Sequence, residues 1–176
     1  MIPPSAYLPW QHDHAQRIYA YFNSRSSPRG TMRDIHAAAM VEQADAEASF
    51  FLDVWGDIYT AYGLWQWHDD RLTRICDFLK APKPVCTGKL TAKNGLSLAQ
   101  QCEGVWHEFQ TSESAAFALL LATDTAYDAG ATACRKYERA GAKGQPEIRG
   151  SRTILWLDWL LKNPLPASSA EHYHGA

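Results

Sequence analysis

Hydrophobic residues recur at intervals of three and four along most of the chain, a spacing that places them on one face of a helix. The last such stretch carries Leu155, Trp156, Trp159 and Leu160. The pattern predicts a mainly α-helical fold. The expected helices cover residues 11–22, 31–48, 66 or 69 to 79, 97–109, 113–122, 123–137 and 152–162.

The ends of several of these helices carry recognisable signals. Thr31 is a suitable N-cap residue, and Ser97 with Gln100 forms a capping-box pattern. The prolines within residues 81–84 stop the preceding helix. The polar stretch 141–150 predicts a loop before the last helix.

The helical period is interrupted over residues 50–63. Aromatic, β-branched and glycine residues mix there without a repeat of 3.6, so we expect a structured loop that can include a short hairpin. No linker or repeat divides the chain. We therefore expect one domain over residues 1–166 and a flexible C-terminal tail over residues 167–176.

Composition and charge exclude several classes of protein. The 176 residues carry 17 Lys and Arg against 19 Asp and Glu, so no positive field attracts nucleic acid. The chain is 46% hydrophobic and 12% aromatic, which excludes intrinsic disorder. No apolar run approaches the ~20 residues of a membrane span, so we expect no membrane insertion. Residues 1–7 lack the basic and apolar regions of a signal peptide.

Motifs that bind cofactors or metals are also missing from the sequence. It has no glycine-rich phosphate loop, no Gly-x-Ser-x-Gly element and no HExxH helix, so we expect no cofactor and no metal. The spacing of Cys76, Cys86, Cys102 and Cys134 matches no zinc site. Free thiols are the simplest interpretation, and a Cys76–Cys86 bridge is an alternative.

The segment 47–71 holds the best candidates for chemistry. Glu47 ends an alanine-rich helix, where we expect the helix dipole and apolar neighbours to disfavour the carboxylate. Such a glutamic acid can act as a general acid. Asp57 follows Gly56, which permits a tight or left-handed backbone that turns the carboxylate toward a cleft. Glycoside hydrolysis needs at least two carboxyl groups that face each other across the cleft.

Each of these acids also has an ordinary interpretation. A glutamate near a helix end is commonly a solvated surface residue. An aspartate after a glycine is commonly a turn former. Spacing alone does not decide between these interpretations and catalysis.

The amino-acid sequence of this segment also resembles that of a known family. Residues 62–67 read Tyr-Gly-Leu-Trp-Gln-Trp, which resembles the Gly-Leu-x-Gln element of goose-type lysozymes and lytic transglycosylases, above all their phage-tail and endolysin branch. In that branch a helix ends in a catalytic Glu, and a Gly-Asp loop, this element and an Arg follow. The corresponding residues here are Glu47, Gly56, Asp57 and Arg71. Tyr137, Glu138 and Arg139 match a later Tyr-Glu-Arg helix end. The resemblance spans residues 32–151.

The resemblance implies a lysozyme-like helical domain with a small loop or β-hairpin region beside the catalytic helix. The sequence departs from the family in three places. Ala48 replaces the usual Ser, the stretch from Glu47 to Asp57 is shorter than in goose-type enzymes, and His68 with Asp69 stands where some goose-type enzymes carry a second acid. Glu47 is the implied general acid. Asp57 is the first choice of base, and His68, Asp69 or no base at all are the alternatives.

The resemblance also implies roles for neighbouring residues. Substrate contact is expected for Trp55, Tyr62, Trp65, Gln66, Trp67, His68 and Tyr137. A supporting role is expected for Gly56, Gly63, Arg71 and Glu138. For Gln66, holding the loop backbone is an equal alternative, and one of Trp65 and Trp67 is expected to pack in the core. For Arg71 we expect an ion pair with Asp57, Asp69 or Glu138.

The expected function is cleavage of the β-1,4 bond between N-acetylmuramic acid and N-acetylglucosamine in peptidoglycan. A monomeric phage endolysin made in the host cytoplasm, and released to the cell wall by a holin-type partner, is the leading hypothesis. A virion-associated lysozyme and a secreted effector are alternatives within the same activity. A lytic transglycosylase, a non-catalytic glycan-binding protein and a virion structural protein are the alternative functions.

Overall fold

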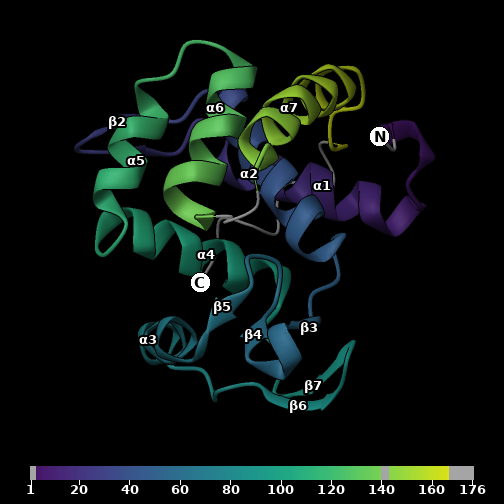
Figure 1. Ribbon diagram of the computed structural model, residues 1–176, viewed down its shortest axis with the longest axis vertical. Coiled ribbons are helices and arrows are strands. Elements are labelled where there is room, and N and C mark those ends of the chain that lie inside the picture. Colours follow the sequence, from purple (N-terminus) through teal and green to yellow (C-terminus); the bar gives the residue numbers. More distant parts are fainter. Residues whose placement is uncertain (1–2, 140–142, 167–176) are drawn as a thin grey trace.

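The computed structural model describes residues 3–139 and 143–166, and helices account for most of them (Figure 1). The α-helices are α1 (Pro9–Phe22), α2 (Asp34–Ala48), α3 (Asp69–Leu79), α4 (Leu98–Gln110), α5 (Ser114–Leu121), α6 (Ala126–Thr132) and α7 (Gln145–Lys162). Shorter turns are η1 (Pro4–Ala6), η2 (Asp57–Tyr59) and the π-helical η3 (Ala133–Glu138). The prediction of a mainly α fold is confirmed.

Short antiparallel strands interrupt the helices. β3 (Trp55–Gly56), β4 (Ala61–Tyr62) and β5 (Trp67–His68) form one sheet in that order. Trp55 pairs with Tyr62, which pairs with Trp67 on its other side. Two hairpins, β1 (Ser26–Ser27) with β2 (Gly30–Thr31) and β6 (Val85–Gly88) with β7 (Thr91–Lys93), complete the strands. The expected hairpin within residues 50–63 is therefore present as β3 and β4.

Helix α2 is the centre of the larger, helical part of the molecule. It contacts α1, α6, α7 and η3, and Figure 1 shows it behind α6 and α7. Four of its alanines, Ala37, Ala38, Ala39 and Ala44, are fully buried, and their short side chains let neighbouring helices pack closely. Most of its polar residues are buried too, so they need partners from the surrounding helices.

The smaller part of the molecule lies below α4 in Figure 1 and holds the three-stranded sheet, α3 and the β6–β7 hairpin. Gly104 of α4 permits the close contact between the two parts. A Cβ atom at this position would lie 2.8 Å from Ile75 and 3.0 Å from the indole of Trp67. The sheet thereby sits close under the helical part.

Three helix boundaries differ from the sequence-based expectation. α7 begins at Gln145 rather than 152, because Pro146 is well tolerated in a first turn. α2 begins after Arg33, whose backbone N–H donates to Nδ1 of His36, while Thr31 belongs to β2. The helix expected to Tyr137 changes to π-helical geometry after Thr132. The expected flexible tail lies outside the described residues.

The remaining structural expectations concern cysteines and membranes. The four cysteines are free, and all but Cys86 are buried. No helix in the described part of the chain combines the length and apolar character needed to cross a bilayer.

Candidate active site

Glu47 lies in the last turn of α2, and side chains of α1 fix the backbone that follows it. Ser49 and Phe50 adopt left-handed conformations with φ of 46° and 65° and so end the helix abruptly. Nε2 of Gln11 donates to the Ser49 carbonyl at 3.0 Å, and Nδ1 of His14 lies 3.0 Å from the Phe50 carbonyl oxygen. Glu47 therefore projects from a firmly held helix end.

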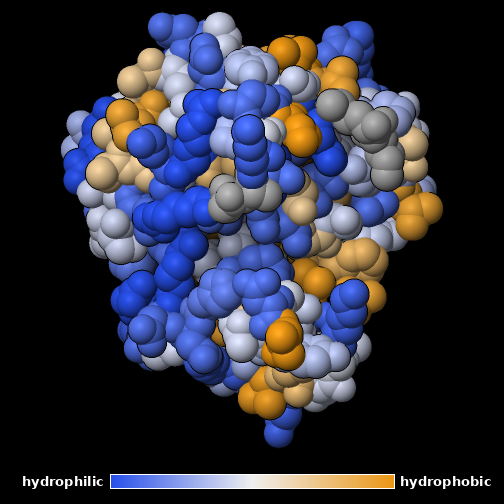
Figure 2. Space-filling view, viewed as in Figure 1, coloured by the Kyte–Doolittle hydropathy of each residue, from blue (hydrophilic) through white to orange (hydrophobic). Residues whose placement is uncertain are grey.

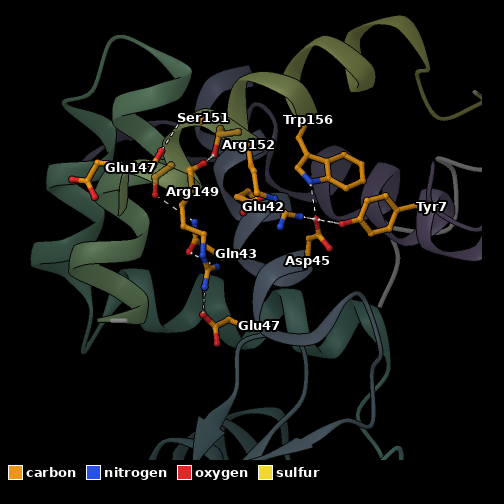
Figure 3. Close-up of polar contacts among 12 residues, drawn as sticks. Tyr7, Glu42, Gln43, Asp45, Glu47, Glu147, Arg149, Ser151, Arg152 and Trp156 are labelled. Carbon is orange, nitrogen blue, oxygen red and sulfur yellow. Dashed lines mark hydrogen bonds and ion pairs between the residues drawn. The ribbon is translucent and has the colours of Figure 1, made fainter. Parts of the chain in front are cut away.

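Arg149 of α7 reaches along α2 to Glu47 (Figure 3). Its Nη2 donates to Oε1 of Glu47 at 2.6 Å, and its Nη1 donates to Oε1 of Gln43 at 3.1 Å. The arginine side chain is buried, whereas the Glu47 side chain keeps 22% of its surface exposed. Arg149 thus orients the carboxyl group and engages one of its two oxygens.

A second charged cluster joins α2 to α7 one turn away. Arg152 lies 3.1 Å from Oε2 of Glu42 and also pairs with Asp45. Oδ2 of Asp45 accepts from the Tyr7 hydroxyl at 2.7 Å and from Nε1 of Trp156 at 3.1 Å (Figure 3). Glu42 is fully buried, and burial raises its pKa to about 8. This cluster fixes the position of α2 against α7.

Glu108 of α4 is the hub that joins the sheet to the helical part. Its two oxygens accept from Nε and Nη2 of Arg71 at 2.7 and 2.9 Å. Oε2 also accepts from Nε1 of Trp67 at 3.0 Å and from the hydroxyl of Tyr137 at 2.7 Å. The expectation that Arg71 pairs with Asp57, Asp69 or Glu138 is therefore wrong, because its ion pair is a bidentate contact with the buried Glu108 on α4.

Glu138 ends η3, which packs against α2 and α7. Its Oε1 is buried and has no hydrogen-bond partner among the described residues. Burial raises the pKa of Glu138 well above its usual range, and the negative charge of Glu47 raises it further. A second carboxyl group, which burial keeps in its neutral form, thus lies within electrostatic reach of Glu47.

Asp57 lies on the smaller part of the molecule. Its side chain is 72% exposed, and its Oδ2 lies 3.2 Å from Nε2 of His68. No hydrogen bond or ion pair within residues 3–139 and 143–166 joins Asp57 to Glu47. The structure therefore brings Asp57 together with His68, the alternative base, rather than with the proposed acid. Asp69, the remaining candidate base, pairs with Lys83 at 3.0 Å.

Four of the aromatic residues expected to contact substrate are core residues instead. Tyr62, Trp65, Trp67 and Tyr137 have at most 1% of their surface exposed. A buried ring cannot stack on a sugar, so the expectation of direct contact is corrected for these four. They carry the sheet and its supports: the Tyr62 hydroxyl donates to Asp53 at 2.6 Å and accepts from the Leu96 backbone at 2.8 Å. Trp55 is almost fully buried, and His68 is exposed.

Gln66 and two glycines hold the loop backbone. Nε2 of Gln66 donates to the Gly63 carbonyl at 2.7 Å, which matches the structural alternative for this residue. A Cβ atom on Gly56 would lie 2.1 Å from Oε1 of Gln66, and one on Gly63 would lie 2.5 Å from Oε1 of Gln101. Gly56 itself has φ of −102°, so it serves close packing and not the left-handed turn that we expected there.

Sequence reasoning missed three residues that shape the site: Arg149, Glu108 and Gln101. Arg149 was assigned to a loop, although Pro146 and Glu147 mark a helix start ahead of it. Glu108 and Gln101 share the buried face of α4 with Val105. Polar residues on an apolar helix face were the available signal, because buried polar groups require partners.

A buried helix that ends in an oriented glutamate beside a small antiparallel sheet defines a lysozyme-like protein. The family model of the phage tail lysozyme matches residues 13–160, and the chain belongs to this family. This match extends beyond the residues 32–151 that carry the resemblance in the sequence. No curated protein and no solved structure matches the chain. Family membership indicates a lysozyme-like, glycan-degrading protein. Among the described residues, no group of three or more His, Cys, Asp or Glu side chains is arranged to hold a metal ion.

Proposed function

We propose that this protein is a peptidoglycan glycosidase that cleaves the β-1,4 bond between N-acetylmuramic acid and N-acetylglucosamine, with Glu47 as the general acid. The observation that carries the proposal is the contact between Glu47 and Arg149 at the end of the buried helix α2. Membership of the phage tail lysozyme family supports glycan as the substrate.

The contact with Arg149 selects which oxygen of Glu47 carries the proton. A guanidinium group only donates hydrogen bonds, so Oε1 of Glu47 must accept. In the acid form the proton therefore resides on Oε2. From there it passes to the glycosidic oxygen as the bond breaks and positive charge develops on the sugar. Arg149 is a positioning residue in this scheme.

Glu138 holds a second proton close to this acid. Because burial favours its neutral form, Glu138 is a hydrogen-bond donor at neutral pH and not a base. We propose that it stabilises the Glu47 carboxylate that proton transfer leaves behind. This role follows the general rule that paired titratable groups with different environments divide the tasks of a site.

The fate of the sugar cation distinguishes two outcomes. In hydrolysis, Asp57 with His68 is the proposed base that orients the attacking water. In a lytic transglycosylase, the 6-hydroxyl of the muramic acid closes a 1,6-anhydro ring, its proton passes to the Glu47 carboxylate, and no water enters. The two outcomes share Glu47 as the acid, and only hydrolysis needs Asp57 as a base.

The biological setting is part of the proposal. Membership of the phage tail lysozyme family supports a virion-associated enzyme that opens the cell wall. An endolysin that depends on a holin-type release partner is the alternative setting, and we propose a monomer in either case.

Mass spectrometry of a digest of purified peptidoglycan tests the proposed function. Hydrolysis yields fragments that end in reducing N-acetylmuramic acid, and transglycosylation yields fragments lighter by one water. The Asp57→Asn variant is expected to lose hydrolysis if Asp57 is the base and to keep full activity otherwise. A wild-type digest that contains neither product would contradict the proposal and favour the non-catalytic, glycan-binding alternative.

A further inference from the structure

A hollow of about 460 Å³ lies on the smaller part of the molecule, and neither Glu47 nor Arg149 lines it. Its lining consists of Trp55, Gly56, Asp57, Ile58, Tyr59 and Lys89. Its volume falls in the range of small-ligand sites, roughly 300–1,000 Å³. Figure 2 shows hydrophobic side chains exposed at this lower end of the molecule, where Figure 1 places β6 and β7.

The backbone that lines the hollow is strained. Asp57, Ile58 and Tyr59 adopt φ of 43°, 54° and 69°, so three consecutive residues with side chains occupy the left-handed region. This region is unfavourable for any residue with a Cβ, and most of all for a β-branched one such as Ile58. Packing does not compensate, because Ile58 is 92% exposed. Strain that is retained at an exposed segment points to a role in ligand recognition.

Neighbouring residues hold this strained turn in place. Oγ1 of Thr60 donates to the Asp57 carbonyl at 2.8 Å, and the Thr60 backbone N–H donates to the Gly56 carbonyl at 3.1 Å. The backbone N–H of Trp55 donates to the Lys89 carbonyl at 2.9 Å. This last bond fixes the turn of the β6–β7 hairpin beside β3, so Lys89 has a defined place at the hollow.

The chemistry of the lining indicates what it can bind. In the described part of the chain, no carboxylate lies within ion-pair distance of the Lys89 ammonium group. Nε1 of Trp55 is buried and has no acceptor among the described residues. Ile58 and Tyr59 add apolar and aromatic surface. With Asp57, the lining presents both signs of charge, which suit a zwitterionic peptide and have no counterpart on an uncharged sugar.

We propose that this hollow binds the peptide stem of peptidoglycan, with Lys89 receiving a stem carboxylate and Ile58 and Tyr59 covering the small apolar side chains. The proposal rests on peptidoglycan being the substrate, as argued above. It makes the enzyme selective for strands that carry peptide, because glycan without stems leaves the hollow empty.

Calorimetric titration with soluble fragments tests the proposal. The probes are the disaccharide N-acetylglucosaminyl-N-acetylmuramic acid with a tetrapeptide stem, and the same disaccharide with its lactyl carboxyl group capped as an N-methylamide, so that it carries no carboxylate. Neither contains the bond that the proposed activity cleaves, so the wild-type protein can be used. We expect the stem-bearing probe to bind wild type about tenfold more tightly, the gain of one hydrogen bond to a charged group.

Variants of two lysines on the β6–β7 hairpin distinguish the effect of the Lys89 charge from any effect on folding. Lys89→Ala is expected to remove the tenfold preference, and Lys89→Arg to retain most of it. Lys93→Ala is the matched control, because Lys93 is also exposed on this hairpin but does not line the hollow. Equal binding of the two probes by wild type, no binding of either, or an unchanged preference in Lys89→Ala would each overturn the proposal.

The outcome is independent of the cleavage assay. A protein that cleaves peptidoglycan but shows no preference for the stem retains the proposed function and loses the stem site. A protein that prefers the stem-bearing probe but releases no products retains the stem site and loses the catalytic function.

Discussion

The interface between α2 and α7 differs from the turn at residues 57–59 in the burial of its side chains and in the strain of its backbone. In the interface, charged groups are buried, and nearly all of them are matched: Arg149 contacts Glu47 and Gln43, and Arg152 contacts Glu42 and Asp45. In the turn, the side chains are exposed and the backbone itself is strained. The interface thus buries charged groups in paired contacts, and the turn keeps an unfavourable backbone conformation at the surface.

Each region accepts a different unfavourable free-energy term, the desolvation of charged groups in the interface and backbone strain in the turn. Burying charge is unfavourable unless geometry is well defined, so a paired cluster holds its members in fixed orientation. That is what a reacting carboxyl group requires. A strained turn at the surface does not orient neighbouring side chains. A bound ligand is therefore the partner that would contact the shape of this turn. We therefore assign proton donation by Glu47 to the interface and recognition of the substrate to the turn.

The largest expected effect comes from the α2–α7 interface. Arg149→Ala removes the partner that orients Glu47, so peptidoglycan cleavage should fall about 100-fold. It also leaves Gln43 and Glu47 unpaired, and the free energy of unfolding should fall by about 3–5 kcal/mol, measured by urea denaturation. Arg149→Lys should recover stability better than rate, because a single ammonium group cannot bridge both partners. Full activity in Arg149→Ala would remove the positioning role.

Glu42 gives the next effect, through pH. Its pKa in the folded protein, about 8, lies above its ordinary value of 4.5, so the folded state holds the proton more tightly than the unfolded chain. The stability that this proton contributes is complete below about pH 4.5 and is lost as the pH rises to about 8. In Glu42→Gln, roughly 2–3 kcal/mol of this pH-dependent decrease in the free energy of unfolding should be absent.

Denaturation curves at pH 5 and pH 8 check this prediction. Glu147→Gln is the control, because Glu147 is an exposed glutamate on α7. If Glu42→Gln showed the same pH dependence as wild type, the buried cluster would not contain a neutral Glu42.

A smaller effect of opposite sign is expected in the turn. Ile58→Gly relieves a left-handed β-branched residue and sacrifices little packing, so the free energy of unfolding should rise by about 1 kcal/mol. Stem-peptide binding should weaken in the same variant, since the apolar cover is removed. Thermal unfolding and titration with the stem-bearing disaccharide measure the two changes. A destabilised Ile58→Gly would show that the turn is not strained.

The smallest effect is expected at Asp57. Asp57→Asn breaks an exposed contact with His68, and such surface pairs contribute at most about 1 kcal/mol. Its urea midpoint should match that of wild type, so any loss of activity reports on chemistry. A large loss of stability would mean that the contact with His68 holds the turn in place.

The sequence predicted the helical fold and the position of Glu47 because both depend on local patterns. Helical spacing identified α2, and the Gly-Leu-x-Gln wording connected Glu47 to lysozyme-like proteins. The β3–β4 hairpin was expected for the same reason, since the loss of helical period between residues 50 and 63 is visible in the sequence alone.

Long-range pairing and backbone strain could not be predicted in this way. Arg149 lies 102 positions from Glu47, and no local pattern links the two. The left-handed turn was expected at Gly56, yet it occupies the three residues that follow, where side chains make it unfavourable. The buried position of Trp67 depends on Glu108, a residue 41 positions away that gives its indole nitrogen a buried acceptor.

The most direct test of the account is the rate at which Glu47→Gln releases new sugar ends from purified peptidoglycan, compared with Glu147→Gln. Both variants neutralise a glutamate that pairs with an arginine, but only Glu47 ends the buried helix α2. We predict that Glu47→Gln loses at least about 100-fold in rate, the contribution of a general acid, while Glu147→Gln matches wild type. Equal rates for the two variants would contradict the assignment of Glu47 as the acid.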